Sequence, residues 1–311
     1  MRRRTFIGAV FSGLSITGLS ARPPKPKEGS IPTRTFGQTE VELTIIGQGG
    51  ARLGLMRTKE EARKHVRRAY DLGLNYFDCA HSYWEGHSEE VYGDVLSEVR
   101  KDVFITSKST QRSAEGAQKE LDLSLKRLKT DYIDLWQIHG VETKQDVERI
   151  LGPGGALETF ESARQKGHCR FIGFTGHHDP EVHLELLRLY NRWDSILMPL
   201  HAADPVYLSF EKQVLPEAVD RGIGIQGMKA FGNAFLLRSL NPRECLEYAL
   251  SLPVDCVTVG CSTQGQLEED VRIVQGFSKL SDERMYELRM MATQGVGSLK
   301  GPALEYWKKG S

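Results

Sequence analysis

Short runs of apolar and β-branched residues alternate with amphipathic windows along most of this chain, from Thr33 onward. Short apolar runs bounded by polar or glycine-containing segments indicate strands, whereas apolar residues that recur every three or four positions indicate helices. The strand pattern is found at residues 44–47, 76–78, 103–106, 133–138, 170–174, 195–198, 224–227 and 256–259.

Helix-start signals lie between these runs. Thr58 with Glu61 has the spacing of a capping box, and Asp179 before Pro180 is typical of an N-cap followed by the first helical residue. Eight strands that alternate with helices are what a closed parallel (β/α)8 barrel, the TIM-barrel fold, requires. The pattern therefore predicts an α/β protein with this fold.

Two further observations refine the predicted barrel. An open, doubly wound sheet is the alternative α/β architecture, but no G-x-G-x-x-G segment follows the first predicted strand. A last amphipathic window from Ser281 to about Ala292 predicts an extra C-terminal helix outside the barrel.

Composition narrows the function classes. The 311 residues include 41 Lys and Arg and 41 Asp and Glu, so the formal net charge is zero. Binding to nucleic acid usually needs a basic face, so we expect no nucleic-acid partner. The five cysteines form no C-x-x-C pair and are odd in number, which predicts isolated buried thiols at Cys79, Cys169, Cys245, Cys256 and Cys261.

The first 32 residues have the organisation of an export signal and a linker. Arg2, Arg3 and Arg4 precede an uncharged, largely apolar stretch at residues 6–19, and a proline-rich segment follows at residues 22–32. The run RRTFI resembles a twin-arginine export signal, which directs the transport of folded proteins. We therefore expect a periplasmic protein with one domain at residues 33–311 that meets a membrane only through its signal; an uncleaved N-terminal anchor is the alternative.

Four reactive side chains stand at or just after the ends of consecutive predicted strands. Asp78 ends the second strand, Tyr83 lies in the loop after it, Lys108 follows the third strand and His139 follows the fourth. Consecutive strands of a barrel are neighbours, and their carboxyl ends face the same side. We therefore expect these side chains to converge.

The same four residue types suit proton transfer at a carbonyl or an alcohol. A free tyrosine has a pKa of about 10, and an ammonium such as that of Lys108 is expected to lower the pKa of Tyr83. Asp78 would hold the lysine charged, and His139 would polarise a substrate carbonyl. A nicotinamide would then exchange a hydride with the substrate.

Several motifs resemble those of the aldo/keto reductases. The run FDCAHSY at residues 77–83, followed by GHSE, is similar to the second-strand signature of that family. The segment from RTFG at residue 34 to GQG at residue 49 resembles its opening β-hairpin and first strand. GCST followed by QLEED, within residues 260–270, resembles its nucleotide-binding end. The resemblance extends from Thr33 to about Val274.

The resemblance implies an NAD(P)H-dependent oxidoreductase that interconverts a small carbonyl compound and an alcohol by hydride transfer. Asp78, Tyr83, Lys108 and His139 correspond to the catalytic tetrad of the family, with Tyr83 as the general acid/base. The resemblance favours NADP as the cofactor, with NAD left open, and it leaves the oligomeric state undetermined.

The expected nicotinamide site departs from the family pattern. Thr175 and Gly176 replace the usual Ser-Asn pair, and Met198 replaces a glutamine on the sixth strand. Met228 followed by Lys229 stands where a nicotinamide-stacking tyrosine is common. The thioether of Met228 can still cover an aromatic ring, and Lys229 can reach a pyrophosphate.

The last barrel helix is expected to contribute the other end of the nucleotide site. Its start at Ser262 and Thr263 has free N–H groups that suit a phosphate. Gln266 stands where many family members carry an arginine for the 2′-phosphate. The remaining cofactor contacts are expected from Gly49, Gly260, Glu269 and Asp270.

Additional histidines fall at strand ends or in the neighbouring loops. They show no close ligand spacing such as H-x-x-x-H, so we expect them to make the substrate pocket polar rather than to bind a metal. They are His81, His87, His177, His178 and His201.

Two other functions are compatible with the sequence. A regulatory barrel that binds nucleotide without turnover fits the altered nicotinamide contacts, although such a protein has no need of a lysine-activated tyrosine. An oxidoreductase that keeps its nucleotide tightly bound is the other alternative, because free nicotinamide nucleotides are scarce outside the cytoplasm.

Overall fold

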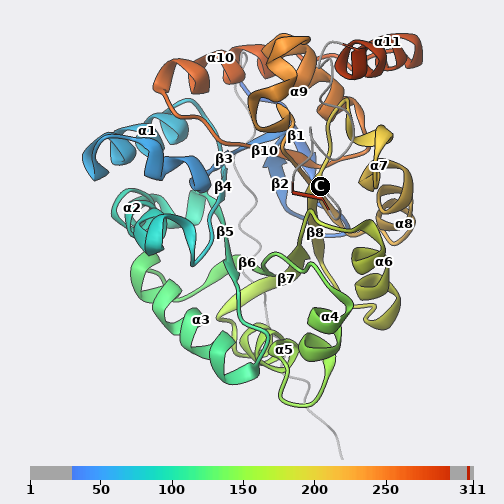
Figure 1. Cartoon of the computed structure of the whole chain (residues 1–311). Coiled ribbons are helices and arrows are strands. Elements are labelled where there is room, and N and C mark those ends of the chain that lie inside the picture. Colours follow the sequence, from blue (N-terminus) through green and yellow to red (C-terminus); the bar gives the residue numbers. More distant parts are fainter. Residues whose placement is uncertain (1–29, 295–306, 309–311) are drawn as a thin grey trace, which may run out of the picture.

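Eight parallel strands close into a barrel in this protein (Figure 1). The computed structural model describes residues 30–294 and 307–308. The last strand pairs with the first, so the barrel has no free edge. The predicted (β/α)8 fold is thereby confirmed. In order around the barrel the strands are β3 (Ile46–Gly49), β4 (Tyr76–Asp78), β5 (Phe104–Ser109), β6 (Ile133–Ile138), β7 (Cys169–Thr175), β8 (Ser195–Pro199), β9 (Gly224–Met228) and β10 (Cys256–Val259).

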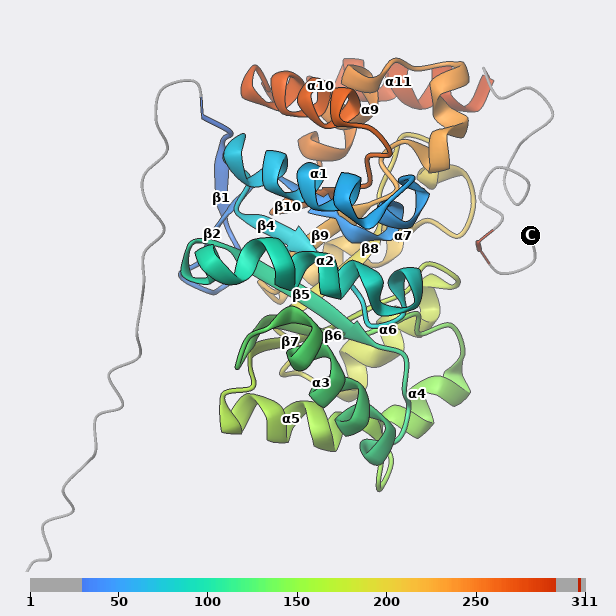
Figure 2. The same ribbon diagram turned by 90° about the vertical axis from the view of Figure 1, so that its left-hand side faces the viewer.

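Helices connect the strands and surround the barrel (Figures 1 and 2). Their apolar faces pack on the strands, where Val66, Leu121 and Phe160 are fully buried. The helix predicted from Ser281 is confirmed as α11, which packs against α9. The α-helices are α1 (Lys59–Asp71), α2 (His87–Leu96), α3 (Ala114–Leu128), α4 (Lys144–Leu151), α5 (Ala156–Lys166), α6 (Pro180–Leu189), α7 (Phe210–Gln213), α8 (Leu215–Asp220), α9 (Pro242–Ser251), α10 (Gln264–Gln275) and α11 (Asp282–Gln294).

The hydrogen bonds predicted at the two helix starts form in the structure, except for one bond of the capping box. The Glu61 N–H donates to the Thr58 hydroxyl at 3.1 Å, and the Glu181 N–H donates to the Asp179 carboxylate at 3.0 Å. The Glu61 carboxylate accepts a hydrogen bond from the Arg57 N–H at 3.0 Å. Because that bond reaches one residue beyond the N-cap, only half of the predicted capping box forms.

An antiparallel hairpin, β1 (Thr33–Thr35) and β2 (Glu42–Thr44), precedes the barrel, as the resemblance implied. The first predicted strand, at residues 44–47, is shifted in the structure. Thr44 pairs with Thr33 in the hairpin, and β3 begins only at Ile46. The Thr44 N–H donates to the Asn75 side-chain oxygen at 2.8 Å, a contact between distant residues that a local pattern does not contain.

The five cysteines are free and buried, as the sequence predicted. Within residues 30–294 and the pair 307–308, no helix has the length and apolar character that a membrane span needs. The predicted export signal and all but the last three residues of the predicted linker lie outside the described residues.

Candidate active site

The four side chains predicted to converge meet at the carboxyl ends of the barrel strands. The Lys108 ammonium lies 2.6 Å from a carboxylate oxygen of Asp78 and 5.1 Å from the centroid of the Tyr83 ring. The rings of Tyr83 and His139 meet edge to face with their centroids 5.5 Å apart. Lys108 lies inside β5 rather than after it, because the strand continues to Ser109.

Burial dominates the electrostatics of Tyr83. We expected Lys108 to bring the pKa of Tyr83 below its ordinary value, but burial raises this pKa to about 12 and the lysine only partly opposes the rise. Burial alone would lower the pKa of Lys108, but Asp78 and Tyr83 outweigh it, so that pKa is raised. The site therefore holds a protonated tyrosine next to a charged lysine.

His139 is a neutral imidazole in this site. Burial, aided by the positive charge of Lys108, lowers the pKa of His139 to about 3. Its Nδ1 atom has no hydrogen-bond partner among the residues that the structure describes. A neutral ring beside Tyr83 can donate a hydrogen bond to a carbonyl oxygen without adding a charge to the site.

The loop that carries Tyr83 adopts a backbone conformation that depends on glycine. Trp84 and Glu85 have φ angles of 49° and 57°, and Gly86 has a φ of 92°. Another residue at Gly86 would be strained at this φ, and its Cβ would lie 2.1 Å from the guanidinium carbon of Arg127 and displace the arginine. The contact between the turn and the arginine therefore supports the position of Tyr83.

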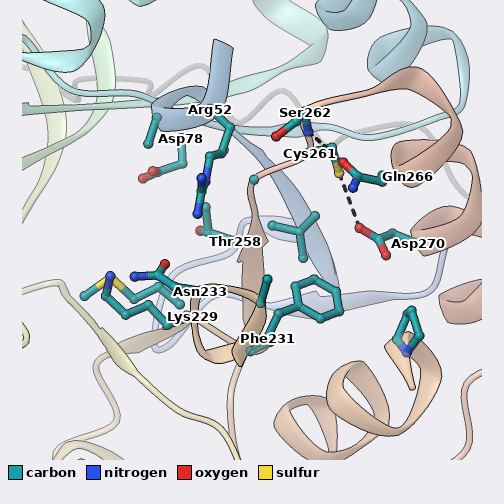
Figure 3. A pocket seen from close by; sticks show the side chains of 18 of the residues that line it. Arg52, Asp78, Lys229, Phe231, Asn233, Thr258, Cys261, Ser262, Gln266 and Asp270 are labelled. Carbon is teal, nitrogen blue, oxygen red and sulfur yellow. Dashed lines mark hydrogen bonds between the residues drawn. The ribbon is translucent and has the colours of Figure 1, made fainter. Parts of the chain in front are cut away.

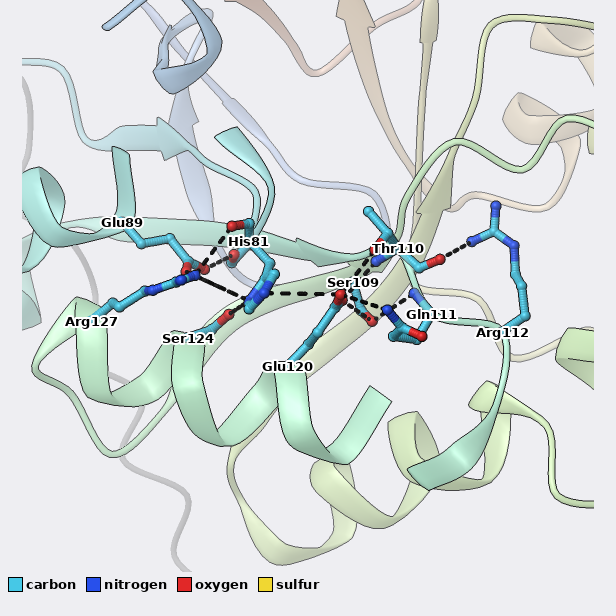
Figure 4. A network of polar contacts seen from close by, with 10 residues as sticks. His81, Glu89, Ser109, Thr110, Gln111, Arg112, Glu120, Ser124 and Arg127 are labelled. Atoms are coloured by element: carbon cyan, nitrogen blue, oxygen red, sulfur yellow. Dashed lines mark hydrogen bonds and ion pairs between the residues drawn. The ribbon is translucent and has the colours of Figure 1, made fainter. Parts of the chain in front are cut away.

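Arg127 belongs to a buried polar network beneath this loop (Figure 4). It lies 3.2 Å from the fully buried Glu89 carboxylate, which also accepts a hydrogen bond from Ser107 of β5. The His81 ring lies between Glu89 and Glu120, with nitrogen–oxygen distances of 4.0 and 3.9 Å. The network joins α2 and α3 to the segment just before Tyr83 and so helps to hold the loop that carries this tyrosine.

Two of the four residues, Asp78 and Tyr83, line a cavity of about 390 Å³ (Figure 3). The carboxyl ends of β3, β9 and β10 and the loops after them form most of its wall. The predicted cofactor residues that line this cavity are Gly49, Met228, Lys229, Gly260, Ser262, Gln266, Glu269 and Asp270.

Four other predicted cofactor residues, Thr175, Gly176, Met198 and Thr263, are not among the residues that line the cavity. Side chains alternate between the two faces of a strand. Met198 is fully buried in the apolar cluster that also contains buried side chains of the surrounding helices. Its neighbour Leu197 lines the cavity instead. The position on β8 that faces the candidate cofactor site is thus Leu197, one residue from the position that the sequence suggested.

Sequence reasoning missed Arg52, which lines the cavity from the loop after β3. A Cβ at Gly260 would lie 2.7 Å from Cγ of Arg52, so the glycine makes room for the arginine. Lys229 faces the same cavity, and burial together with Arg52 lowers its pKa to about 8. Arg52 lies in the segment that follows strand β3, and this position in the sequence could have identified it as a candidate. The two cations and the glycine backbone fit a nucleotide with a pyrophosphate.

The start of α10 differs from the expected phosphate site. The Ser262 N–H donates to the side-chain oxygen of Gln266 at 2.8 Å. The Gln266 N–H in turn donates to the Thr263 hydroxyl at 3.3 Å. These two N–H groups are therefore already satisfied within the protein, and phosphate binding at the helix start stays a prediction.

Asp270 provides a stability test of this end of the cavity. Burial raises the pKa of Asp270 from 3.8 to about 7, and the Cys261 thiol, 3.3 Å away, partly opposes the rise. Because the folded protein then holds this proton more tightly than the unfolded chain, the stabilisation is present below the unfolded pKa and is lost as the pH rises toward the folded pKa.

We expect wild type to lose about 2 kcal/mol more free energy of unfolding than Asp270→Asn between pH 5 and pH 8. Urea denaturation of both proteins at the two pH values measures this difference. Parallel pH dependences would show that Asp270 does not titrate in this way.

The additional histidines lie in different parts of the structure and contact different partners. His81 lies in the polar network, and His87 lies 2.8 Å from the carboxylate of Glu90. Burial lowers the pKa of His177 to about 4. No group of three potential metal ligands gathers anywhere in the described part of the chain.

Trp307 packs against a residue that lines the cavity, and Lys308 follows it in the chain. The Lys229 ammonium lies 4.5 Å from the centroid of the Trp307 ring, and His178 contacts the Trp307 carbonyl oxygen at 3.2 Å. Lys308 and Asp204 form a fully buried ion pair at 2.7 Å. The sequence pattern did not indicate these contacts, because they join residues about a hundred positions apart.

Comparison with known proteins identifies oxidoreductases as relatives of this chain. A sequence model of the aldo/keto reductase family matches residues 45–244. An uncharacterized oxidoreductase of Bacillus subtilis is 30% identical over 154 residues, which are 46% of this chain and 48% of the relative. L-Galactose dehydrogenase of Arabidopsis thaliana is 30% identical over 158 residues, 47% of this chain and 49% of the relative. The matches thus span about half the length of these curated relatives.

Solved structures share the fold. The holo form of an aldo-keto reductase from Bacillus halodurans aligns with a TM-score of 0.72 at 24% sequence identity. The alignment covers 84% of this chain and 96% of that one, so the likeness extends over nearly the whole barrel.

Proposed function

Because the chain belongs to the aldo/keto reductase family, we propose that it is an NAD(P)H-dependent oxidoreductase that interconverts a small carbonyl compound and the corresponding alcohol. The observation that carries this proposal is the meeting of Tyr83, Lys108 and His139 beside a cavity with two cations in its wall. A protein that only binds a nucleotide has no use for this proton-transfer geometry.

In the direction of reduction, the substrate oxygen accepts hydrogen bonds from the Tyr83 hydroxyl and the His139 ring. A pKa of about 12 keeps the proton on Tyr83 until negative charge develops on the substrate oxygen. Lys108 then stabilises the phenolate that remains, and Asp78 holds the lysine in place. Tyr83 is thus the general acid in reduction and the general base in oxidation.

A nicotinamide dinucleotide supplies or accepts the hydride when it is bound. We assign Met228 and Leu197 to the apolar wall beside the catalytic residues. Arg52 and Lys229 are assigned to the pyrophosphate, because they are the cations that line the cavity in the described part of the chain.

The test is turnover of NADH and NADPH by the purified full-length protein with a panel of aldehydes and ketones, followed by the loss of reduced-nicotinamide absorbance. We expect turnover of at least one carbonyl compound. Reversible nucleotide binding with no turnover of any carbonyl or alcohol would support the regulatory barrel instead. Nucleotide that is released only on denaturation would support the enzyme with a tightly held cofactor.

We also propose that the protein is exported by the twin-arginine route, on the basis of Arg3, Arg4 and the apolar stretch after them. Cell fractionation of wild type and an Arg3→Lys/Arg4→Lys variant tests this. We expect wild type in the periplasmic fraction and the variant in the cytoplasm, and an equal distribution of the two proteins would contradict it.

A further inference from the structure

We propose that the cavity discriminates against a 2′-phosphate, so that this protein binds NAD(H) in preference to NADP(H). This inference rests on the proposed function and goes against the NADP preference that the family resemblance suggests. Charge and hydrogen-bond donors are unevenly distributed along the cavity.

The positive charges of the cavity lie toward the catalytic end. In Figure 3, Arg52 and Lys229 lie on the side of Asp78, whereas Gln266 and Asp270 lie at the opposite end. A dinucleotide with its nicotinamide near Tyr83 therefore places its pyrophosphate by the two cations. Its adenosine ribose then falls toward the start of α10.

None of the described residues that line that far end is a cation. The described residues that line it from α10 are Gln266, Glu269 and Asp270. Arg68, which reaches α10 from α1, lies 2.8 Å from the Glu268 carboxylate and does not line the cavity. An NADP-binding site usually provides an arginine for the 2′-phosphate, and this site has no counterpart among the residues that line it.

Two of the backbone donors at the start of α10 are already engaged. The Ser262 N–H is bonded to the Gln266 side chain, and the Gln266 N–H is bonded to Thr263. A phosphate that used these donors would have to displace both bonds. These two N–H groups therefore bind a phosphate only at the cost of the bonds that they already make, and a neutral N–H group does not supply the positive charge of an arginine.

The carboxylates at this end favour ribose hydroxyls over a phosphate. Glu269 is exposed on α10, and Asp270 is 4% exposed beside the Cys261 thiol. A carboxylate accepts hydrogen bonds from a free 2′-hydroxyl, whereas it repels a 2′-phosphate that carries nearly two negative charges. Charge and hydrogen bonding therefore both favour the unphosphorylated nucleotide.

The experiment measures the dissociation constants of NADH and NADPH by titration calorimetry at pH 8, where Asp270 is ionised because its pKa is about 7. Competition by 5′-AMP and 2′,5′-ADP repeats the comparison without the nicotinamide. We expect NADH to bind at least about tenfold more tightly than NADPH, and 5′-AMP to compete better than 2′,5′-ADP. Equal or tighter binding of NADPH would overturn the inference while the proposed function stands.

The variant Glu269→Gln/Asp270→Asn removes both charges while it keeps the side-chain shapes. We expect it to reduce the preference for NADH about fivefold or more, mainly because NADPH binds more tightly. Glu268→Gln on the same helix is the matched control, since Glu268 pairs with Arg68 outside the cavity, and it should leave the preference unchanged.

A double variant with wild-type preference would contradict the assignment to these carboxylates, and circular dichroism of each variant checks its fold. If wild type binds neither nucleotide, the proposed function fails and this inference fails with it. The wild-type nucleotide titrations and fragment competition do not depend on any variant, so the inference can be overturned even if the double variant does not fold.

Discussion

Tyr83→Phe is expected to lower turnover at least about a hundredfold while nucleotide affinity stays nearly unchanged. The substitution removes only the hydroxyl that is proposed to donate the proton. The aromatic ring remains, so its edge-to-face contact with His139 and its position below the Lys108 ammonium are retained. Steady-state rates with the best carbonyl substrate, together with the dissociation constant of the preferred nucleotide, measure the two effects separately.

The control for this prediction is the thermal unfolding of the variant, which should match that of wild type because no buried ion pair is broken. Turnover at the wild-type rate would remove Tyr83 from the proton-transfer step. A large loss of nucleotide affinity would instead indicate that the tyrosine hydroxyl positions the cofactor.

Lys108→Met is expected to destabilise the fold and to lower turnover together. Lys108 is fully buried, and its ammonium lies 2.6 Å from the carboxylate of Asp78, which is itself buried. Removal of one partner leaves an uncompensated buried charge, which typically costs about 3–5 kcal/mol. We expect a loss of this size in the free energy of unfolding, measured with urea, and a fall in turnover of at least about a hundredfold because the phenolate of Tyr83 loses its stabilising charge.

The double variant Asp78→Asn/Lys108→Met separates the two effects. Because it removes both charges of the pair, it should regain about half or more of the lost free energy of unfolding while turnover stays low. A single Lys108→Met variant as stable as wild type would show that the ion pair does not hold the site together. Recovery of turnover in the double variant would contradict the role of the lysine.

Much of the fold was predictable from local patterns in the sequence. Strands β4, β6 and β10 have the predicted bounds, because each is a short apolar run between clear breaks. Predicted strand order also placed Asp78, Tyr83, Lys108 and His139 at one end of the barrel, since neighbouring parallel strands end on the same side. The meeting of these four residues needed no tertiary information beyond the fold class.

Other features depended on contacts between residues far apart in the chain. Thr44 belongs to the hairpin because it pairs with Thr33, and its N–H is held by the distant Asn75. The register of β8 turns Leu197 rather than Met198 toward the cavity. The pKa of Tyr83 rises where the neighbouring lysine alone would lower it, because burial is a property of the folded surroundings.

Local patterns in the amino-acid sequence were enough to predict the barrel and the convergence of the four polar side chains at its carboxyl end, because periodicity and strand order are local properties of the chain. The direction of side chains, their degree of burial and the use of hydrogen-bond donors depend on how distant segments pack. The start of α10 illustrates the difference. Its sequence suggests free N–H groups, but in the folded protein the side-chain oxygen of Gln266 accepts a hydrogen bond from the Ser262 N–H. Solvent exclusion and side-chain partners arise only when distant segments pack together, and they decide the chemistry that the same residues can perform.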